Sequence, residues 1–183
     1  MKILKFGGKS LANDGIEKVI DIIITSHNEP LSVVVSARGN TTDELEALLE
    51  KASRGEDYTA DFQQLKDEQQ YNDSVSFEPE FQLLEKLLEG VSLLKDYSPK
   101  TKDLVLAQGE LMSAKLVTAL LQRKGLESTF VDSREIFKTD AVVGNAQIIN
   151  SVSEKLTRDR FATIPPNCVA VVTGFIASTE KGD

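Results

Sequence analysis

The sequence predicts an α/β fold, a three-layer αβα sandwich built on a mostly parallel sheet. Continuous runs of apolar, often β-branched residues alternate with longer segments in which apolar residues recur every three or four positions. Strands that are apolar on both faces are typical of parallel sheets covered on each side by helices. With 183 residues, of which 40% are hydrophobic and 27% charged, the chain is long enough to bury a single sizeable core.

Two strand, loop and helix units open the chain. The first has a short apolar strand at residues 3–6, a glycine pair at 7–8 and helical apolar spacing over 10–26. In the second, residues 31–35 form a β-branched strand, and residues 36–40 form a loop before the next helix. Repeated units of this kind favour parallel pairing of their strands.

The middle of the chain is predicted to be mostly helical. Residues 58–95 show helical spacing throughout, with a hinge at 71–79, and we expect them to form a helical insertion within the domain. Residues 104–123 predict one long helix that ends near Gly125, because glycine accepts the positive φ of a helix end.

The last third adds a strand at 129–131, a helix at 147–160 and a buried strand at 168–173. The polar turn at 178–183 then follows a strand, with no later element to pair with it or cover it. Natural domains usually end on an element. We therefore expect the fold to be incomplete at its C-terminus.

Composition excludes several classes of function. A net charge of -8 and a pI near 4.8 disfavour binding to nucleic acid, and no basic stripe is interleaved with aromatic residues. No apolar run approaches the roughly 18 residues of a spanning helix, and no signal peptide is visible, so we expect no membrane and a cytoplasmic location. A single cysteine, Cys168, and a single histidine, His27, predict neither a disulfide nor a zinc site.

Residues 5–10, Lys-Phe-Gly-Gly-Lys-Ser, are the most informative stretch. A glycine pair after a strand lets backbone amides approach an anion at a helix start, and Lys5 adds positive charge. The stretch is not a P-loop, because that motif requires glycine where this chain has Ile3. Spacing alone leaves two interpretations open, a phosphate site or a plain tight turn with Lys5 in solvent.

The same stretch resembles the opening Lys-Phe-Gly-Gly-Thr-Ser signature of aspartate kinases in the amino acid kinase family. Further blocks follow in the family's order and cover essentially the whole chain. These blocks are Val34-Val35-Ser36-Ala37 followed by Thr42, Gln108-Gly109-Glu110-Leu111-Met112-Ser113, Val131-Asp132-Ser133-Arg134 and Thr173-Gly174-Phe175-Ile176. The resemblance implies that residues 1–183 are the amino-terminal part of an amino acid kinase domain.

It also implies an activity, the transfer of the γ-phosphoryl group of ATP with Mg²⁺ to the side-chain carboxylate of L-aspartate. The product, 4-phospho-L-aspartate, begins lysine, threonine and methionine biosynthesis. Lys5 would be catalytic, offsetting charge on the phosphoryl oxygens. Together with Gly7, Gly8 and Ser10 it would bind the ATP phosphates, and no residue of the chain is assigned to a metal.

For the acceptor, the resemblance implies Ser36, Thr42 and Glu110. A carboxylate that pairs with the ammonium group is a sensible selector for an amino acid. Without the family, Glu110 is a dipole-favourable acid at a helix start and Thr42 is a helix cap. Arg134 and Phe175 also lie in matched blocks. A surface ion pair would explain Arg134 equally well, and a position in the core would explain Phe175 equally well.

The chain departs from the family pattern at Lys9, where threonine is usual, and at Ala177, where glycine is common. The family's glycine-rich segment with an arginine and an aspartate would follow Asp183, so we expect little or no kinase activity from this chain alone. The full-length form is expected to be a homo-oligomer.

Two alternatives remain. One is another amino acid kinase relative that acts on glutamate, acetylglutamate, carbamate or a nucleotide, against which Lys-Phe-Gly-Gly and Gly-Glu-Leu-Met-Ser favour aspartate. The other is a noncatalytic α/β module in which the glycines are turns and the helices of 58–95 form a partner surface.

Overall fold

A computed structural model describes residues 1–71, 74–142 and 145–182. Its strands are β1 (Lys2–Phe6), β2 (Leu31–Val35), β3 (Ser128–Val131), β4 (Lys138–Thr139), β5 (Val169–Thr173) and β6 (Ser178–Thr179). Its helices are the short 3₁₀ helix η1 (Gly8–Leu11), α1 (Gly15–Ser26), α2 (Thr41–Ser53), α3 (Thr59–Gln69), α4 (Glu78–Leu94), α5 (Pro99–Arg123), α6 (Ser133–Ile136) and α7 (Asn150–Ala162).

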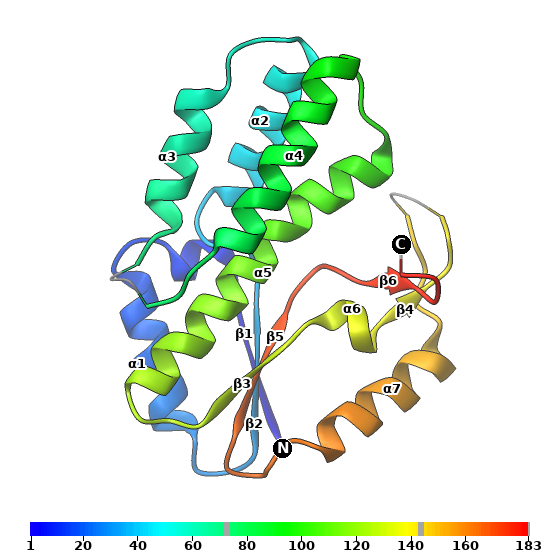
Figure 1. The fold of residues 1–183 in the computed structure, drawn as a ribbon. Helices are drawn as coiled ribbons and strands as arrows, with labels where there is room; N and C mark the ends of the chain where they lie inside the picture. The colour runs from blue at the N-terminus through cyan, green and yellow to red at the C-terminus, as the bar shows by residue number, and fades with distance from the viewer. Residues whose placement is uncertain (72–73, 143–144, 183) are drawn as a thin grey trace.

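Four parallel strands form the central sheet in the order β1-β2-β5-β3 (Figure 1). The α/β class and the parallel sheet are thus confirmed. Since all four strands run in the same direction, their carboxyl ends meet at one edge, and the loops that follow them are neighbours in space. A second, two-stranded parallel pair joins β4 to β6.

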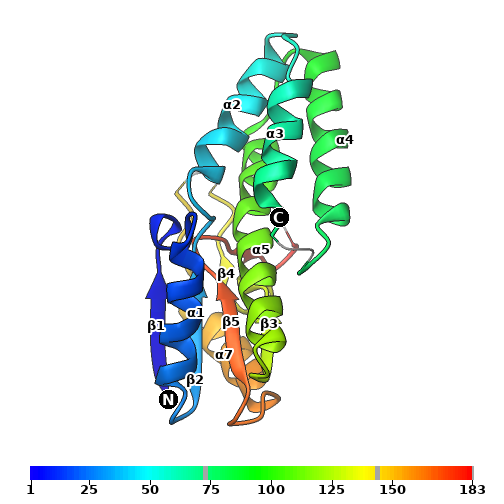
Figure 2. The ribbon, with the colours of Figure 1, turned by 90° about the vertical axis from the view of Figure 1, so that its left-hand side faces the viewer.

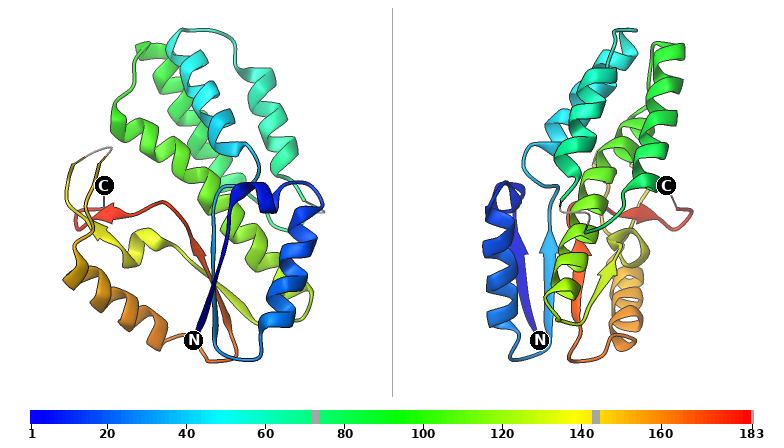
Figure 3. Two further views of the ribbon diagram at one scale, coloured as in Figure 1. Left: turned by 180° about the vertical axis from the view of Figure 1, so that it is seen from behind. Right: turned by 60° about the vertical axis from the view of Figure 1, so that its left-hand side comes forward.

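Different helices cover the two faces of the sheet. On one face, alternate residues of β2 and β5 such as Val33 and Val171 are fully buried in a core cluster shared with α1 and α5. On the other face, Ala170 and Val172 pack with Phe161 of α7. Figure 3 shows α1 and α7 on opposite sides of the strands, which gives the expected three layers.

The helices α2, α3 and α4 stand beyond the carboxyl ends of the strands (Figure 2). Helices α2 and α4 pack against α5, and α3 packs against α2. Their apolar side chains, such as Leu45, Phe62 and Leu84, belong to the same core cluster as the sheet. By length and composition α5 could cross a membrane, but 78% of its most apolar window is buried inside the fold. We therefore treat α5 as the core helix that joins this helical arm to the sheet.

Several predicted boundaries are wrong at helix ends. The helix expected over 10–26 is divided into η1 and α1, because Asn13 takes a left-handed φ of 48° between them. Helix α5 begins at Pro99 rather than Leu104, since the Ser98 side chain accepts a hydrogen bond from the Thr101 amide at 3.1 Å and caps it.

The predicted hinge at 71–79 extends two residues too far at its C-terminal end. Helix α4 begins at Glu78 and holds Pro79 in its first turn, where a missing amide hydrogen costs no helical bond. Residues 72 and 73 of that hinge lie outside the described residues. The helix expected from Gln147 begins at Asn150.

The turn predicted at 178–183 is also partly wrong. Ser178 and Thr179 form β6 and pair with β4, so this segment does have a partner. Its last residue, Asp183, lies outside the described residues. The short elements α6, β4 and β6 were not predicted, because two to four residues carry too little periodicity to be recognised.

Candidate functional site

The loops after β1 and β2 lie side by side at the carboxyl edge of the sheet. The Ser36 amide donates to the Phe6 carbonyl at 3.2 Å, and the Gly39 amide donates to the Gly8 carbonyl at 2.9 Å. Ligands of open parallel sheets bind at this edge. The structure thus brings together two of the sequence blocks on which the predicted site depends.

Close packing of these loops requires glycine at position 8. A Cβ atom on Gly8 would lie 2.3 Å from the Ala37 carbonyl oxygen, far inside van der Waals contact. At Gly7 the nearest neighbour of such an atom would be the Lys5 ammonium at 3.7 Å, an ordinary contact. Gly8 therefore has a structural reason to be glycine, whereas Gly7 borders open space next to a cation.

Lys5 lies at the end of β1 and is exposed. Its ammonium group is 5.8 Å from the centre of the Phe175 ring, and that ring is 85% exposed on a residue with a left-handed φ of 59°. Within the described residues Lys5 has no carboxylate partner at ion-pair distance. Its charge is thus available to an anion. The exposed ring shows that the core interpretation of Phe175 is wrong.

Glu110 approaches the same loops from α5. It is only 6% exposed, and its Oε1 atom accepts a hydrogen bond from the Ala37 amide at 3.2 Å. Burial raises the pKa of this carboxyl, and the Ala37 amide opposes the rise. Glu110 lies in the middle of a helix that begins at Pro99, so its interpretation as a helix-start acid is wrong.

The other predicted residues take different positions. Ser36 is 8% exposed, and its Oγ atom has no hydrogen-bond partner among the described residues. Thr42 is exposed in the first turn of α2, two residues beyond the N-cap Asn40, so its interpretation as a helix cap is wrong. Ser10 is exposed in η1, and its amide donates to the Gly7 carbonyl at 2.9 Å.

Arg134, in the short helix α6, pairs with the N-cap residue of that helix. Its guanidinium group contacts both carboxylate oxygens of Asp132, with one contact of 2.5 Å, so the ion-pair interpretation is confirmed. This pair raises the pKa of Arg134. Lys9, which departs from the family pattern, is exposed.

Two contributors to the site were not predicted. Ala37 acts through its backbone: its amide donates to the Glu110 carboxylate, and its carbonyl oxygen lies against Gly8. Such a role cannot be recognised from the identity of the side chain. Gly109 lets α5 approach the loop, because a Cβ there would lie 2.9 Å from the Ala37 Cβ. The sequence could have indicated this role, because glycine is disfavoured inside a helix and Gly109 directly precedes Glu110.

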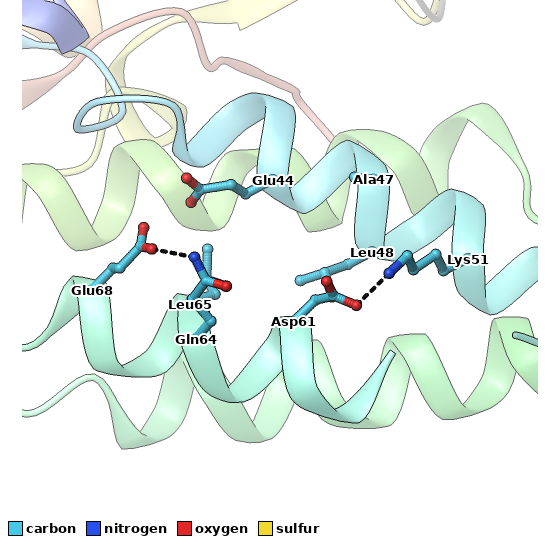
Figure 4. A pocket seen from close by; sticks show the side chains of 8 residues that line it. All are labelled: Glu44, Ala47, Leu48, Lys51, Asp61, Gln64, Leu65 and Glu68. Atoms are coloured by element: carbon cyan, nitrogen blue, oxygen red, sulfur yellow. Dashed lines mark hydrogen bonds and ion pairs between the residues drawn. The ribbon is translucent and has the colours of Figure 1, made fainter. Parts of the chain in front are cut away.

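A separate hollow lies between α2 and α3 on the helical arm (Figure 4). An ion pair between Lys51 and Asp61 at 2.5 Å closes one end of it, and Glu44 and Glu68 lie at the other. None of the predicted site residues lines it.

Comparison with known proteins identifies the family. The family model described as the amino acid kinase family matches residues 1–183. The chain belongs to the amino acid kinase family. It is 28% identical to the bifunctional aspartokinase/homoserine dehydrogenase 2 of Arabidopsis thaliana, over 97% of this chain and 21% of that protein. With the lysine-sensitive aspartokinase 3 of Escherichia coli it shares 28% identity over 98% of this chain and 41% of the relative.

Solved structures of this family support the fold. The E. coli aspartokinase III structure in complex with aspartate and ADP has a TM-score of 0.84 and 26% identity, over 98% of this chain and 42% of that one. The aspartate kinase of Clostridium acetobutylicum, at 21% identity and a TM-score of 0.73, shows the same fold. This amino acid kinase chain spans well under half the length of the relatives it matches.

Proposed function

We propose that the full-length protein transfers the γ-phosphoryl group of ATP to the side-chain carboxylate of L-aspartate, giving 4-phospho-L-aspartate. One observation carries the proposal: an exposed lysine, with no carboxylate partner among the described residues, and a buried carboxylate lie at the same pair of loops at the carboxyl edge of the sheet. The aspartokinase relatives, one of which holds aspartate and ADP in its structure, support the choice of substrates.

On this proposal the phosphoryl donor lies beside β1. Lys5 would offset the charge that develops on the γ-phosphoryl oxygens, and the amides of Gly7 and Gly8, with the Ser10 hydroxyl, would contact the phosphates. Mg²⁺ would arrive bound to the ATP phosphates. A carboxylate oxygen of the acceptor attacks the γ-phosphorus as the bond to ADP breaks, and no proton need move.

The acceptor would lie beside β2 and α5. Glu110 would pair with the substrate ammonium, which offsets the cost of an ionised carboxylate at a buried position. Ser36, buried at the end of β2, and Thr42, in the first turn of α2, would line the remainder of the acceptor site. Selection of an amino acid over a plain dicarboxylate follows from the charge of Glu110.

A panel of acceptors offered to the full-length protein tests this proposal. L-aspartate, L-glutamate, N-acetyl-L-glutamate, carbamate and a nucleoside monophosphate would each be supplied with magnesium ATP, and ADP release would be measured. We expect turnover with L-aspartate alone. Preference for another acceptor would identify a different amino acid kinase, and calorimetry that detects neither aspartate nor nucleotide would favour the noncatalytic module.

Assembly and location remain predictions. We expect a homo-oligomer, which light scattering on the full-length protein would measure. We also expect a cytoplasmic location, although several plant relatives are named chloroplastic.

A further inference from the structure

Gln69 is a buried polar residue on an otherwise apolar helix face. It is the last residue of α3 and is 3% exposed, and the other buried residues of this helix are Phe62 and Leu65. At this spacing of three and four residues, an apolar side chain would suffice for packing. A buried amide instead costs free energy unless it is hydrogen-bonded. The contacts of the Gln69 amide therefore indicate what this side chain contributes.

The Gln69 amide begins a chain of hydrogen bonds that all run in one direction. Gln69 Nε2 donates to Thr41 Oγ1 at 2.7 Å, and Thr41 Oγ1 donates to the Arg38 carbonyl at 2.5 Å. Thr41 is 1% exposed, so its hydroxyl depends on protein partners. Its single proton goes to Arg38, and the bond that it accepts from Gln69 polarises the hydroxyl as a donor.

The chain continues through one peptide unit into the glycine turn after β1. The Arg38 carbonyl and the Gly39 amide belong to the same planar peptide, so holding the carbonyl also fixes the direction of the amide. That amide donates to the Gly8 carbonyl at 2.9 Å. Gly39 permits this orientation because its φ of 61° is left-handed. An unbroken series of hydrogen bonds thus joins the end of α3 to Gly8.

We propose that Gln69 is a positioning residue for the phosphate site. Through Thr41 it fixes the peptide between Arg38 and Gly39, and that peptide holds Gly8. The inference rests on the phosphate site of the proposed function and deepens it. Gln69 acts without touching either substrate, since its amide is occupied by Thr41. The helical arm therefore contributes to phosphoryl transfer as well as to the core.

Gln69→Met in the full-length protein tests this role, because methionine is similar in shape and has no N–H donor. The kcat/KM for ATP should fall by about threefold to tenfold, as for the loss of one buried hydrogen bond. The KM for the acceptor should stay unchanged, because Glu110 accepts from the Ala37 amide, which belongs to a different peptide. Gln63→Met is the matched control, since Gln63 lies on the exposed face of α3 and donates to Asp67. It should change neither constant.

Substitutions at Thr41 separate positioning from packing. Thr41→Val keeps the shape but loses the hydroxyl, and it should lower the kcat/KM for ATP at least as much as Gln69→Met does. Thr41→Ser keeps the hydroxyl and should be close to the wild type. Because both residues act through one chain of hydrogen bonds, adding Gln69→Met to Thr41→Val should cause little further loss.

Two results would overturn the inference. One is an unchanged kcat/KM for ATP in a Gln69→Met protein that circular dichroism shows to be folded. The other is a pair of losses, at Gln69 and at Thr41, that add fully in the double variant. If Gln69→Met does not fold, Thr41→Val compared with Thr41→Ser decides in its place, and equal kcat/KM values for ATP would overturn the inference.

The acceptor panel keeps this test distinct from that of the proposed function. The ATP kinetics are measured with whichever acceptor the wild type uses. A preference for an acceptor other than L-aspartate would refute the proposed function, and the Gln69→Met comparison would still decide the positioning role. A wild type that binds no ATP would refute both.

Discussion

Ala37 connects the two halves of the candidate site through its backbone. Its amide is held by the buried Glu110 carboxylate at 3.2 Å, and its carbonyl oxygen lies against Gly8 of the β1 loop. The residue proposed to bind the acceptor thus also contacts the loop that packs against Gly8, one of the two glycines proposed to bind phosphate. A substitution at Glu110 should therefore weaken acceptor binding while the fold persists, whereas a substitution at Gly8 should lower the stability of the fold.

Glu110→Gln should remove acceptor binding while the fold persists. The glutamine carbonyl can still accept from the Ala37 amide, but the charge that attracts an ammonium group is lost. Burial raises the pKa of Glu110, so in the wild type the KM for aspartate should rise as the pH falls through a value above the ordinary glutamate range of about 4.3.

A raised carboxyl pKa also means that the ionised form costs folding stability at higher pH. Glu110→Gln should therefore be at least as stable as the wild type at pH 7, and its KM should be high at every pH. Kinetics and thermal unfolding across pH 5 to 8 check both points. A glutamine variant that keeps the wild-type KM would contradict this role.

Gly8→Ala should destabilise the fold, whereas Gly7→Ala should not. The new methyl group at position 8 would meet the Ala37 carbonyl oxygen at 2.3 Å, and relieving that overlap costs about 1 to 3 kcal/mol. At position 7 the backbone already has φ -78° and ψ 163°, which alanine adopts freely. Urea unfolding of the two variants provides the comparison, and equal stabilities would disprove the close contact.

At the scale of elements, the sequence predicted strands better than helix ends. The strand at Leu31–Val35 was predicted at its true bounds, because five consecutive apolar or small residues between turn signals allow few alternatives. Helix starts depend on single capping contacts, such as that of Ser98 before α5, which periodicity does not reveal. The strand β6 could not be predicted, since two residues become a strand only through pairing with β4.

The facing helices α2 and α3 bring the carboxylates of Glu44 and Glu68 to the same hollow. Glu44 on α2 has one carboxylate oxygen buried without a partner among the described residues. Burial and the nearby Glu68 raise its pKa, and Asp43 adds to this effect while Arg38 opposes it. Ionisation of Glu44 therefore opposes the packing of the two helices.

Glu44→Gln should stabilise the chain at pH 7 and have little effect near pH 4. Because the folded-state pKa is raised, the wild type loses stability as the pH rises from the ordinary carboxyl range of about 4.3 through that raised value. Glutamine cannot ionise and avoids the loss. Thermal unfolding at the two pH values measures the difference, and a variant less stable than the wild type at pH 7 would show that the charge is favourable.

For the whole molecule, the fold class predicted from the sequence is confirmed, whereas the contacts that shape the candidate site were not predicted. Ordered motifs indicated Lys5, the glycine pair, Ser36 and Glu110, and parallel strands then bring their loops to one edge. The structure adds how α5 reaches that edge, through Gly109 and a buried carboxylate in mid-helix. Such contacts depend on the crossing of α5 over the sheet, which no local pattern encodes.

The most direct test of the account is phosphoryl transfer by Lys5→Ala in the full-length protein, with Lys2→Ala at the other end of β1 as the control. Acyl phosphate formed from L-aspartate and magnesium ATP would be trapped with hydroxylamine and quantified. The proposed catalytic role of Lys5 predicts a loss of turnover of about a hundredfold or more in Lys5→Ala, as for removal of a group that stabilises transition-state charge, and near-normal turnover in Lys2→Ala. Near-normal turnover in a folded Lys5→Ala protein would contradict it.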